Sequence, residues 1–105
     1  MNPFDLTGTT ALVSGSSRGI GLALAKGLLQ AGSRVTIHGR NIDQVKTTAL
    51  DLAEETGGET GVSTFDVTDQ DAVDRGIADI EQEWGTPDIL VNNAGIQRRA
   101  PFTEF

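Results

Sequence analysis

The feature that most constrains the fold is an apolar segment that ends in a glycine-rich turn and leads into a helix-like pattern. The apolar segment covers residues 10–14, and Gly15, Gly19 and Gly21 follow it. Glycine adopts backbone angles that other residues avoid, and it lets a ligand or a second backbone come close. A helix that begins at such a turn presents unpaired N–H groups and the positive end of its dipole, which favour an anion. The pattern therefore predicts a buried strand that turns into a phosphate-binding helix N-terminus.

Two interpretations of this turn are open on its glycines alone. Their spacing is Gly-x-x-x-Gly-x-Gly, which differs from the Gly-x-Gly-x-x-Gly of the common dinucleotide fingerprint. An ordinary glycine-rich turn would also fit three glycines. The strand predicted before the turn and the helix predicted after it favour the dinucleotide interpretation.

Strand and helix patterns alternate along the rest of the chain. Apolar residues at helical spacing predict helices over 18–31, from Asn41 to the glycines at 57–58, and from Asp69 to Gly85. Asn41 and Asp69 are the candidate N-caps of the second and third of these helices. Further strands are expected over 33–38, over 62–65 and from Asp88 onward. The alternation predicts an α/β fold of Rossmann type, with a doubly wound parallel sheet in the order 3-2-1-4. We expect the first two helices to cover one face of the sheet. A stripe from Val73 to Trp84 on the third helix should pack against the other face.

Composition excludes several classes of function. The chain has 105 residues, so it forms one small domain at most, and its formal net charge of -7 disfavours nucleic acid or an anionic membrane as partner. It has no cysteine, hence no disulfide or thiolate metal site, and no other metal-ligand cluster is evident. No signal peptide or membrane-spanning run is visible, so we expect a cytoplasmic protein.

The end of the second predicted strand bears on which dinucleotide would bind. It reads Ile37-His38-Gly39-Arg40-Asn41 and contains no carboxylate. A carboxylate there would accept hydrogen bonds from a free ribose 2′-hydroxyl, whereas arginine accommodates a 2′-phosphate. We expect Arg18 in the glycine turn to converge on Arg40, and a guanidinium can make two parallel bonds to phosphate. The sequence thus favours NADP(H) over NAD(H), the alternative being that Arg40 is a solvated loop residue.

His38 is the only histidine in the chain. It has no evident carboxylate or serine partner in the sequence, and an isolated histidine rarely acts as a general base. We expect it to be a strand-end residue near the adenosine end of the site, neither a catalytic base nor a metal ligand.

Three segments resemble the short-chain dehydrogenase/reductase family. They are residues 14–21, Phe65-Asp66-Val67-Thr68 and Asn92-Asn93-Ala94-Gly95, each at the end of a predicted strand and in the family's order. Ser14 stands where the family usually has threonine, so a hydroxyl is kept. The resemblance covers nearly the whole chain and implies a cofactor site made of Gly15, Ser17, Arg18, Gly19, Ile20, Gly21, Arg40, Asn41, Asp66, Val67, Asn93, Ala94 and Gly95.

The resemblance also implies roles for single residues. Asp66 would contact the adenine amino group with the Val67 backbone beside it, although an aspartate at this position could equally cap a turn. Asn93 and Gly95 would line the cofactor, and Asn92 would help to fix the end of the fourth strand.

Residues 96–105 resemble the branch of the family that interconverts gluconate and 5-ketogluconate. Sugar-acid, polyol and 3-oxoacyl reductases vary in this stretch, so a 3-oxoacyl reductase-like relative is an alternative. Arg98 and Arg99 could reach the carboxylate of a small sugar-acid substrate, or they could be a solvated pair.

No catalytic residue is expected in this chain. The family uses a tyrosine, a lysine and a serine that lie beyond the fourth strand, and the chain contains no tyrosine. Residues 1–105 are therefore expected to be the NADP(H)-binding Rossmann portion of a longer oxidoreductase, truncated before the catalytic segment. The resemblance implies a homo-oligomer, commonly a tetramer, for the complete enzyme. The alternatives are a stand-alone, non-catalytic dinucleotide-binding module and an interaction domain with an inactive site.

Overall fold

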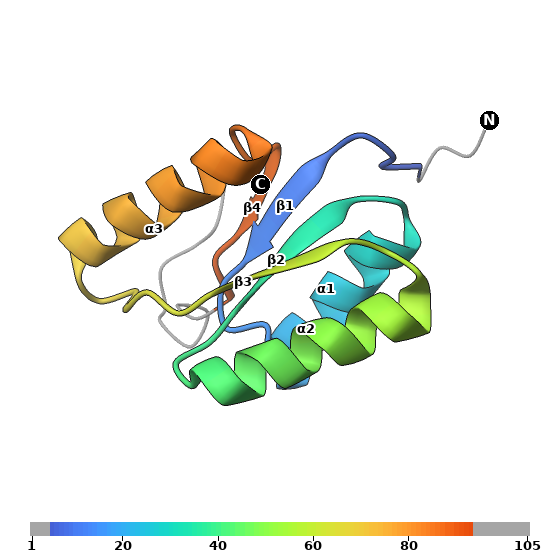
Figure 1. Cartoon of the computed structure of the whole chain (residues 1–105), viewed down its shortest axis with the longest axis horizontal. Helices are drawn as coiled ribbons and strands as arrows, with labels where there is room; N and C mark the ends of the chain where they lie inside the picture. Colours follow the sequence, from blue (N-terminus) through green and yellow to red (C-terminus); the bar gives the residue numbers. More distant parts are fainter. Residues whose placement is uncertain (1–4, 94–105) are drawn as a thin grey trace.

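The computed structural model describes residues 5–93, and in this part of the chain strands and helices alternate as the sequence predicts (Figure 1). The elements are β1 (Thr10–Val13), α1 (Gly19–Gln30), β2 (Arg34–His38), α2 (Ile42–Thr56), β3 (Thr60–Ser63), α3 (Gln70–Trp84) and β4 (Ile89–Val91).

The strands form one parallel sheet in the order β3-β2-β1-β4, which confirms the predicted order. β1 lies between β2 and β4, with Val13 opposite both Ile37 and Val91. Because all strands run in the same direction, their carboxyl ends meet at one edge of the sheet. After β3 the chain crosses back over the sheet and forms β4 on the other side of β1. The switch point where such folds bind ligands therefore lies at this edge, between β1 and β4.

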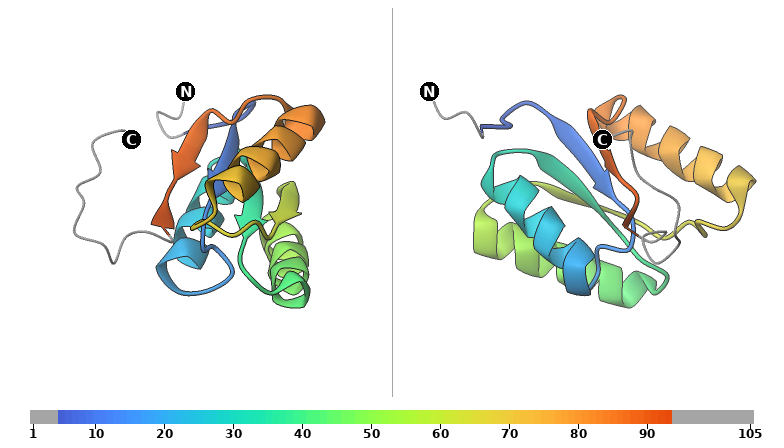
Figure 2. Two further views of the ribbon diagram at one scale, coloured as in Figure 1. Left: turned by 90° about the vertical axis from the view of Figure 1, so that its left-hand side faces the viewer. Right: turned by 180° about the vertical axis from the view of Figure 1, so that it is seen from behind.

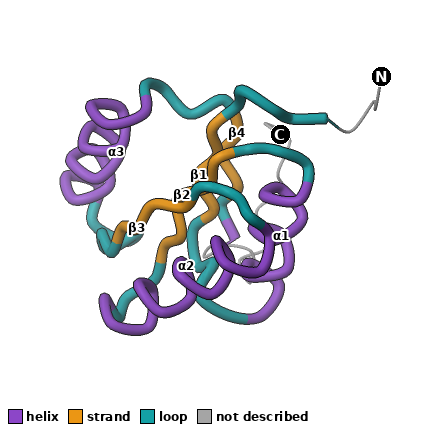
Figure 3. Tube along the Cα trace, turned by 45° about the vertical axis from the view of Figure 1, so that its right-hand side comes forward, coloured by secondary structure: helices purple, strands orange, loops and turns teal. Residues whose placement is uncertain are grey.

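The helices lie in two layers, one on each side of the sheet. α1 and α2 lie together on one face and α3 lies on the other, as Figures 1 and 2 show. The tube in Figure 3 shows the same separation, with α3 on one side of the strands and α1 and α2 on the other. The buried apolar cluster lies between the sheet and the α1/α2 layer and consists of Ala11, Val13, Ala25, Leu29, Val35, Ile37, Val45, Ala49 and Leu52.

Two predicted helix caps are present. The Asn41 side chain accepts a hydrogen bond from the Gln44 N–H at the start of α2. The Asp69 carboxylate accepts two, from the N–H groups of Asp71 and Ala72. Such caps satisfy backbone donors that a helix leaves without internal partners.

The third strand lies two residues earlier than the sequence pattern predicts. The β-branched and aromatic residues at 62–65 favour a strand there, but pairing in the structure runs from Thr60 to Ser63. Ser63 is opposite His38, the last residue of β2, so β3 has no partner beyond that point. The length of the neighbouring strand, and not local propensity, sets where β3 ends.

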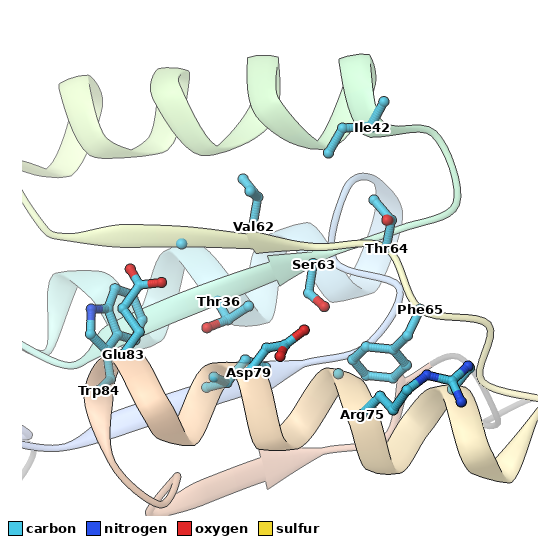
Figure 4. Close-up of a pocket in the computed structure, with 14 residues that line it drawn as sticks. Thr36, Ile42, Val62, Ser63, Thr64, Phe65, Arg75, Asp79, Glu83 and Trp84 are labelled. Atoms are coloured by element: carbon cyan, nitrogen blue, oxygen red, sulfur yellow. The ribbon is translucent and has the colours of Figure 1, made fainter.

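The apolar stripe of α3 is less buried than predicted. Of Val73, Ile77, Ile80 and Trp84, only Ile80 is buried, and the other three are half-buried. A hollow of about 430 Å³ lies between α3 and strands β2 and β3, with side chains from both layers turned toward it (Figure 4). α3 therefore rests on the sheet without closing over it.

Candidate cofactor-binding site

The glycine turn joins β1 to α1 with two residues in left-handed backbone conformations. Gly15 has φ +63° and Gly19 has φ +65°, a region that side chains disfavour. Arg18 is the N-terminal cap residue of α1 and makes no side-chain cap hydrogen bond. Ile20 in the first helical turn is 67% exposed. The α1 N-terminus therefore faces outward with its first N–H groups uncapped by side chains.

Gly21 allows a close approach between α1, the turn and the end of β4. A Cβ atom at this position would lie 2.2 Å from the Gly15 carbonyl oxygen and 2.6 Å from Asn93 Nδ2. The same amide, Asn93 Nδ2, donates a hydrogen bond to the Gly15 carbonyl oxygen at 3.1 Å. Two motifs that are 78 residues apart in the chain thus meet in one contact.

The ends of β1 and β4 are joined beside this contact. The Ser14 N–H donates to the Val91 carbonyl oxygen at 3.0 Å, and the Ser14 hydroxyl lies 3.3 Å from Asn92 Oδ1. Asn92 therefore helps to fix the end of the fourth strand. The hydroxyl of Ser14, the residue that stands where the family usually has threonine, takes part in this contact.

His38 is buried between the glycine turn and the residues that follow β3. Its Nδ1 accepts the Gly15 N–H at 3.0 Å, and its Nε2 lies 2.7 Å from the Phe65 carbonyl oxygen. The His38 backbone exchanges hydrogen bonds with Ser16, and the imidazole and Phe65 rings are 4.4 Å apart. Burial lowers the pKa of His38, while the Phe65 carbonyl acts in the opposite direction.

Asp66 stabilises its own turn and is exposed to solvent. Its Oδ1 accepts from the Thr68 hydroxyl at 2.7 Å and from the Thr68 N–H at 2.9 Å. These bonds lower the pKa of Asp66, and the positive charge of Arg40 lowers it further. Asp66 thus stabilises a turn, as the alternative interpretation predicts, and its contact with adenine stays a prediction.

Arg40 and Asn41 follow a tightly packed Gly39. A Cβ at Gly39 would lie 2.7 Å from Ser17 Oγ and 2.9 Å from Val45 Cγ2. This close packing holds the end of β2 against the glycine turn. Arg18 and Arg40 are both exposed, and Asn41 serves as the cap of α2.

The described site residues all gather at the carboxyl edge of the sheet. They follow β1 (Gly15, Ser17, Arg18, Gly19, Ile20, Gly21), β2 (Arg40, Asn41), β3 (Asp66, Val67) and β4 (Asn93). Four others, Ala94, Gly95, Arg98 and Arg99, lie outside the described residues. Sequence reasoning missed the contacts of His38, because both of its partners are backbone groups that no side-chain motif identifies.

Two further findings concern residues 5–93. These residues contain no cluster of His, Cys, Asp or Glu side chains that could hold a metal ion. None of the helices in this range has the length and apolar character needed to cross a membrane.

A glycine turn that opens a helix at the switch point of a 3-2-1-4 parallel sheet defines an α/β domain of Rossmann type. The comparison with protein families is more specific, since residues 9–105 match the short chain dehydrogenase family. The chain belongs to this family.

Individual relatives refine the comparison. Gluconate 5-dehydrogenase from Gluconobacter oxydans (strain 621H) is 53% identical over 102 residues, which are 97% of this chain and 40% of the relative. 5-Keto-D-gluconate 5-reductase from Escherichia coli (strain K12) is 40% identical over 102 residues, again 40% of that protein. The resemblance to this branch is confirmed, and the chain spans about two fifths of the length of these relatives.

Solved structures show the same fold. A gluconate 5-dehydrogenase from Burkholderia cenocepacia J2315, in complex with NADP and tartrate, matches with a TM-score of 0.82 and 46% identity over 97% of this chain and 40% of that one. L-Sorbose reductase from Gluconobacter frateurii, complexed with NADPH and L-sorbose, gives 0.83 and 33% over 92% and 39%.

Proposed function

We propose that this chain is the NADP(H)-binding part of a short-chain oxidoreductase that interconverts 5-ketogluconate and gluconate. The observation that supports it best is the close contact of Gly21, Gly15 and Asn93 at the switch point of the sheet. This contact brings the glycine turn and the end of the fourth strand to one place, where a dinucleotide needs both. Relatives from the gluconate branch of the family support the substrate assignment.

The residues at this edge fit a phosphorylated dinucleotide. A Cβ built on Gly19 meets nothing within 4 Å, so there is open space beside the turn, and the α1 N-terminus has no side-chain cap. The glycine turn would hold the pyrophosphate. Arg40 would bind the 2′-phosphate, assisted by Arg18. Asp66 would accept a hydrogen bond from the adenine amino group, and its lowered pKa keeps it ionised.

The chain's own residues bind and orient in this proposal, and they do not transfer protons. When bound, the nicotinamide supplies hydride exchange with the carbonyl carbon of the substrate. The chain contains no tyrosine, so the family's acid/base group would come from the remainder of a longer protein.

Nucleotide fluorescence tests the cofactor assignment directly on the 105-residue chain. We expect saturable binding of NADPH that is tighter than binding of NADH. Arg40→Ala should weaken NADPH binding about tenfold or more, because a hydrogen bond between charged groups contributes about 1.5–3 kcal/mol. Binding of NADH, which has no 2′-phosphate, should change little.

Lys26→Ala is the matched control for this experiment. It also removes one positive charge, but Lys26 pairs with Glu55 in the last turn of α2, whereas Arg40 precedes the first turn of that helix. Equal losses for NADPH and NADH in Arg40→Ala, or equal losses in both variants, would argue against a 2′-phosphate site at Arg40. Absence of binding for both nucleotides would contradict the proposed function of this chain.

A separate experiment tests the substrate. This chain is joined to the part of a relative that follows the matched residues, and activity on 5-ketogluconate is compared with activity on a 3-oxoacyl substrate.

A further inference from the structure

The directions of its hydrogen bonds fix the protonation form of His38. The Gly15 backbone nitrogen can only donate, so His38 Nδ1 must be the acceptor of that 3.0 Å bond. The Phe65 carbonyl oxygen can only accept, so His38 Nε2 must carry the hydrogen of the 2.7 Å bond. The imidazole is therefore neutral, with its hydrogen on Nε2.

A second proton on this ring would break one of the two bonds. It would attach to Nδ1 and face the Gly15 N–H, so that two donors would oppose each other. His38 is only 3% exposed, which leaves little room for water to take either bond. Desolvation lowers the pKa of the ring, in agreement with this geometry.

Charged groups near the ring are few and exposed. β1 and β3 contain no titratable residue, and Arg34, the other titratable residue of β2, lies at the opposite end of that strand. On α3, Arg75 lines the hollow together with Phe65. The adjoining turns and helix starts carry exposed charged residues: Arg18, Arg40, Asp43, Asp66, Asp69 and Asp71.

We propose that neutral His38 is a positioning residue that holds the glycine turn and the Phe65–Asp66 turn at one spacing, and that its protonation weakens dinucleotide binding. This inference rests on the proposed function, in which the first turn binds the pyrophosphate and the second binds adenine. The two turns are separate in sequence, and the imidazole is bonded to a backbone group of each.

Linkage gives the sign of the pH dependence. If the dinucleotide binds the neutral form, the effect of His38 on affinity is constant at pH values above the pKa of His38 in the free chain. Below that pKa, the dissociation constant rises about tenfold per pH unit. Reciprocally, saturation with dinucleotide lowers the pKa of His38 further.

The unmodified chain offers a direct measurement, because His38 is its only histidine and its ring signals need no assignment by mutation. We expect ¹⁵N NMR shifts of the Nε2–H form and a titration midpoint below the ordinary 6.5. The midpoint should fall further when NADPH is saturating. A hydrogen on Nδ1, or the same midpoint with and without NADPH, would overturn the inference.

Two variants separate positioning from mere structural support. His38→Asn places an amide oxygen where Nδ1 lies, keeps an acceptor for the Gly15 N–H and cannot titrate. It keeps the bond to the glycine turn but loses the bond to the Phe65 carbonyl, so at pH 7.5 it should bind NADPH more weakly than the unmodified chain and more tightly than His38→Leu. His38→Leu leaves both backbone partners unpaired and should bind about tenfold more weakly or worse.

The pH profile of His38→Asn also controls for protonation of the ligand itself. The 2′-phosphate itself titrates near pH 6, so its contribution is common to both chains. We expect a steeper loss of affinity in the unmodified chain than in His38→Asn once the pH falls below the lowered pKa of His38, and identical profiles would overturn the inference. Binding without this difference contradicts only the role of His38. No binding at any pH contradicts the proposed function and removes the role with it.

Discussion

The face of the sheet under α1 and α2 is closed by apolar side chains, whereas the part of the other face that β2 and β3 form under α3 is lined mainly by small and polar ones. Val13, Val35 and Ile37 point into the first layer and are fully buried. Thr36, Gly61 and Ser63 line the hollow under α3 (Figure 4). The glycine turn opens α1, so the segment proposed to bind the pyrophosphate is built on the better packed half.

The α3 residues that face the sheet show the same difference. Its Gly76 sits against the Phe65 ring, where a Cβ would come within 2.2 Å, and its Trp84 lies over Gly61. Arg75, Asp79 and Glu83 also line the hollow, and charged side chains cannot close an apolar core. Helical periodicity predicts which residues of a helix face a sheet, but it does not predict how closely the helix approaches.

Truncating one core residue on each face should give the largest contrast. Ile37→Ala should lower the free energy of unfolding by about 2–5 kcal/mol, because it leaves a cavity in the packed α1/α2 layer. Ile77→Ala removes a half-buried side chain from a second hollow under α3, which Leu12 and Leu90 also line, and should cost about 1 kcal/mol. Urea denaturation followed by circular dichroism measures both values, and similar losses would refute the contrast between the faces.

A methyl group added at either of two glycines of α1 compares a closely packed position with an open one in the same helix. Gly21→Ala should destabilise the fold by about 1–3 kcal/mol and abolish nucleotide binding, because the new Cβ would overlap the Gly15 carbonyl. Gly27→Ala is its control, since a Cβ there meets nothing, and it should stabilise α1 by about 0.5–1 kcal/mol. Thermal melts and NADPH titration check the pair. A Gly21→Ala chain that binds like the unmodified one would contradict the close-approach argument.

Association between chains should depend on the β4 side of the sheet more than on α2. Leu90 on β4 is 53% exposed, and β4 pairs only with β1 among the described strands. We expect concentration-dependent association in sedimentation, reduced by Leu90→Lys, because exposed strands and apolar patches promote it. Leu50→Lys on α2, where Leu50 is 71% exposed, is the control and should have little effect. A monodisperse monomer for the unmodified chain would remove this expectation.

The smallest expected effect is a loss of stability in mild acid. His38 has a lowered pKa in the folded chain, so the unfolded chain binds protons more readily. The contribution of His38 is therefore fully present above pH 6.5 and is lost as pH falls through the lower folded pKa. Melting temperatures measured at stepwise lower pH test this. The downward slope should be shallower in His38→Asn, and equal slopes would exclude His38 as its source.

Sequence reasoning succeeded where a residue's effect is local or periodic. Asn41 and Asp69 were predicted as caps from their positions before apolar patterns, and both make the expected bonds. The strand order follows from the alternation of elements, which leaves few topologies for a parallel sheet.

It failed where partners meet across the fold. The end of β3 depends on where β2 stops, which no local pattern encodes. The bonds of His38 join backbone atoms 23 and 27 residues away, and backbone groups leave no trace in a sequence. The openness of the α3 face depends on the small residues that face it from two strands.

The packing of Gly39 has a consequence for attempts to reverse the proposed cofactor preference. A designer who wants NADH would first think of placing an acidic residue at the end of β2. At position 39 the new side chain would have to displace Ser17 of the glycine turn and Val45, which is fully buried. The usable design position is Arg40, whose exposed side chain can be exchanged without touching the core. The close packing of Gly39 against the glycine turn thus excludes one position at the end of β2 and leaves its neighbour, Arg40, for changing the proposed nucleotide specificity.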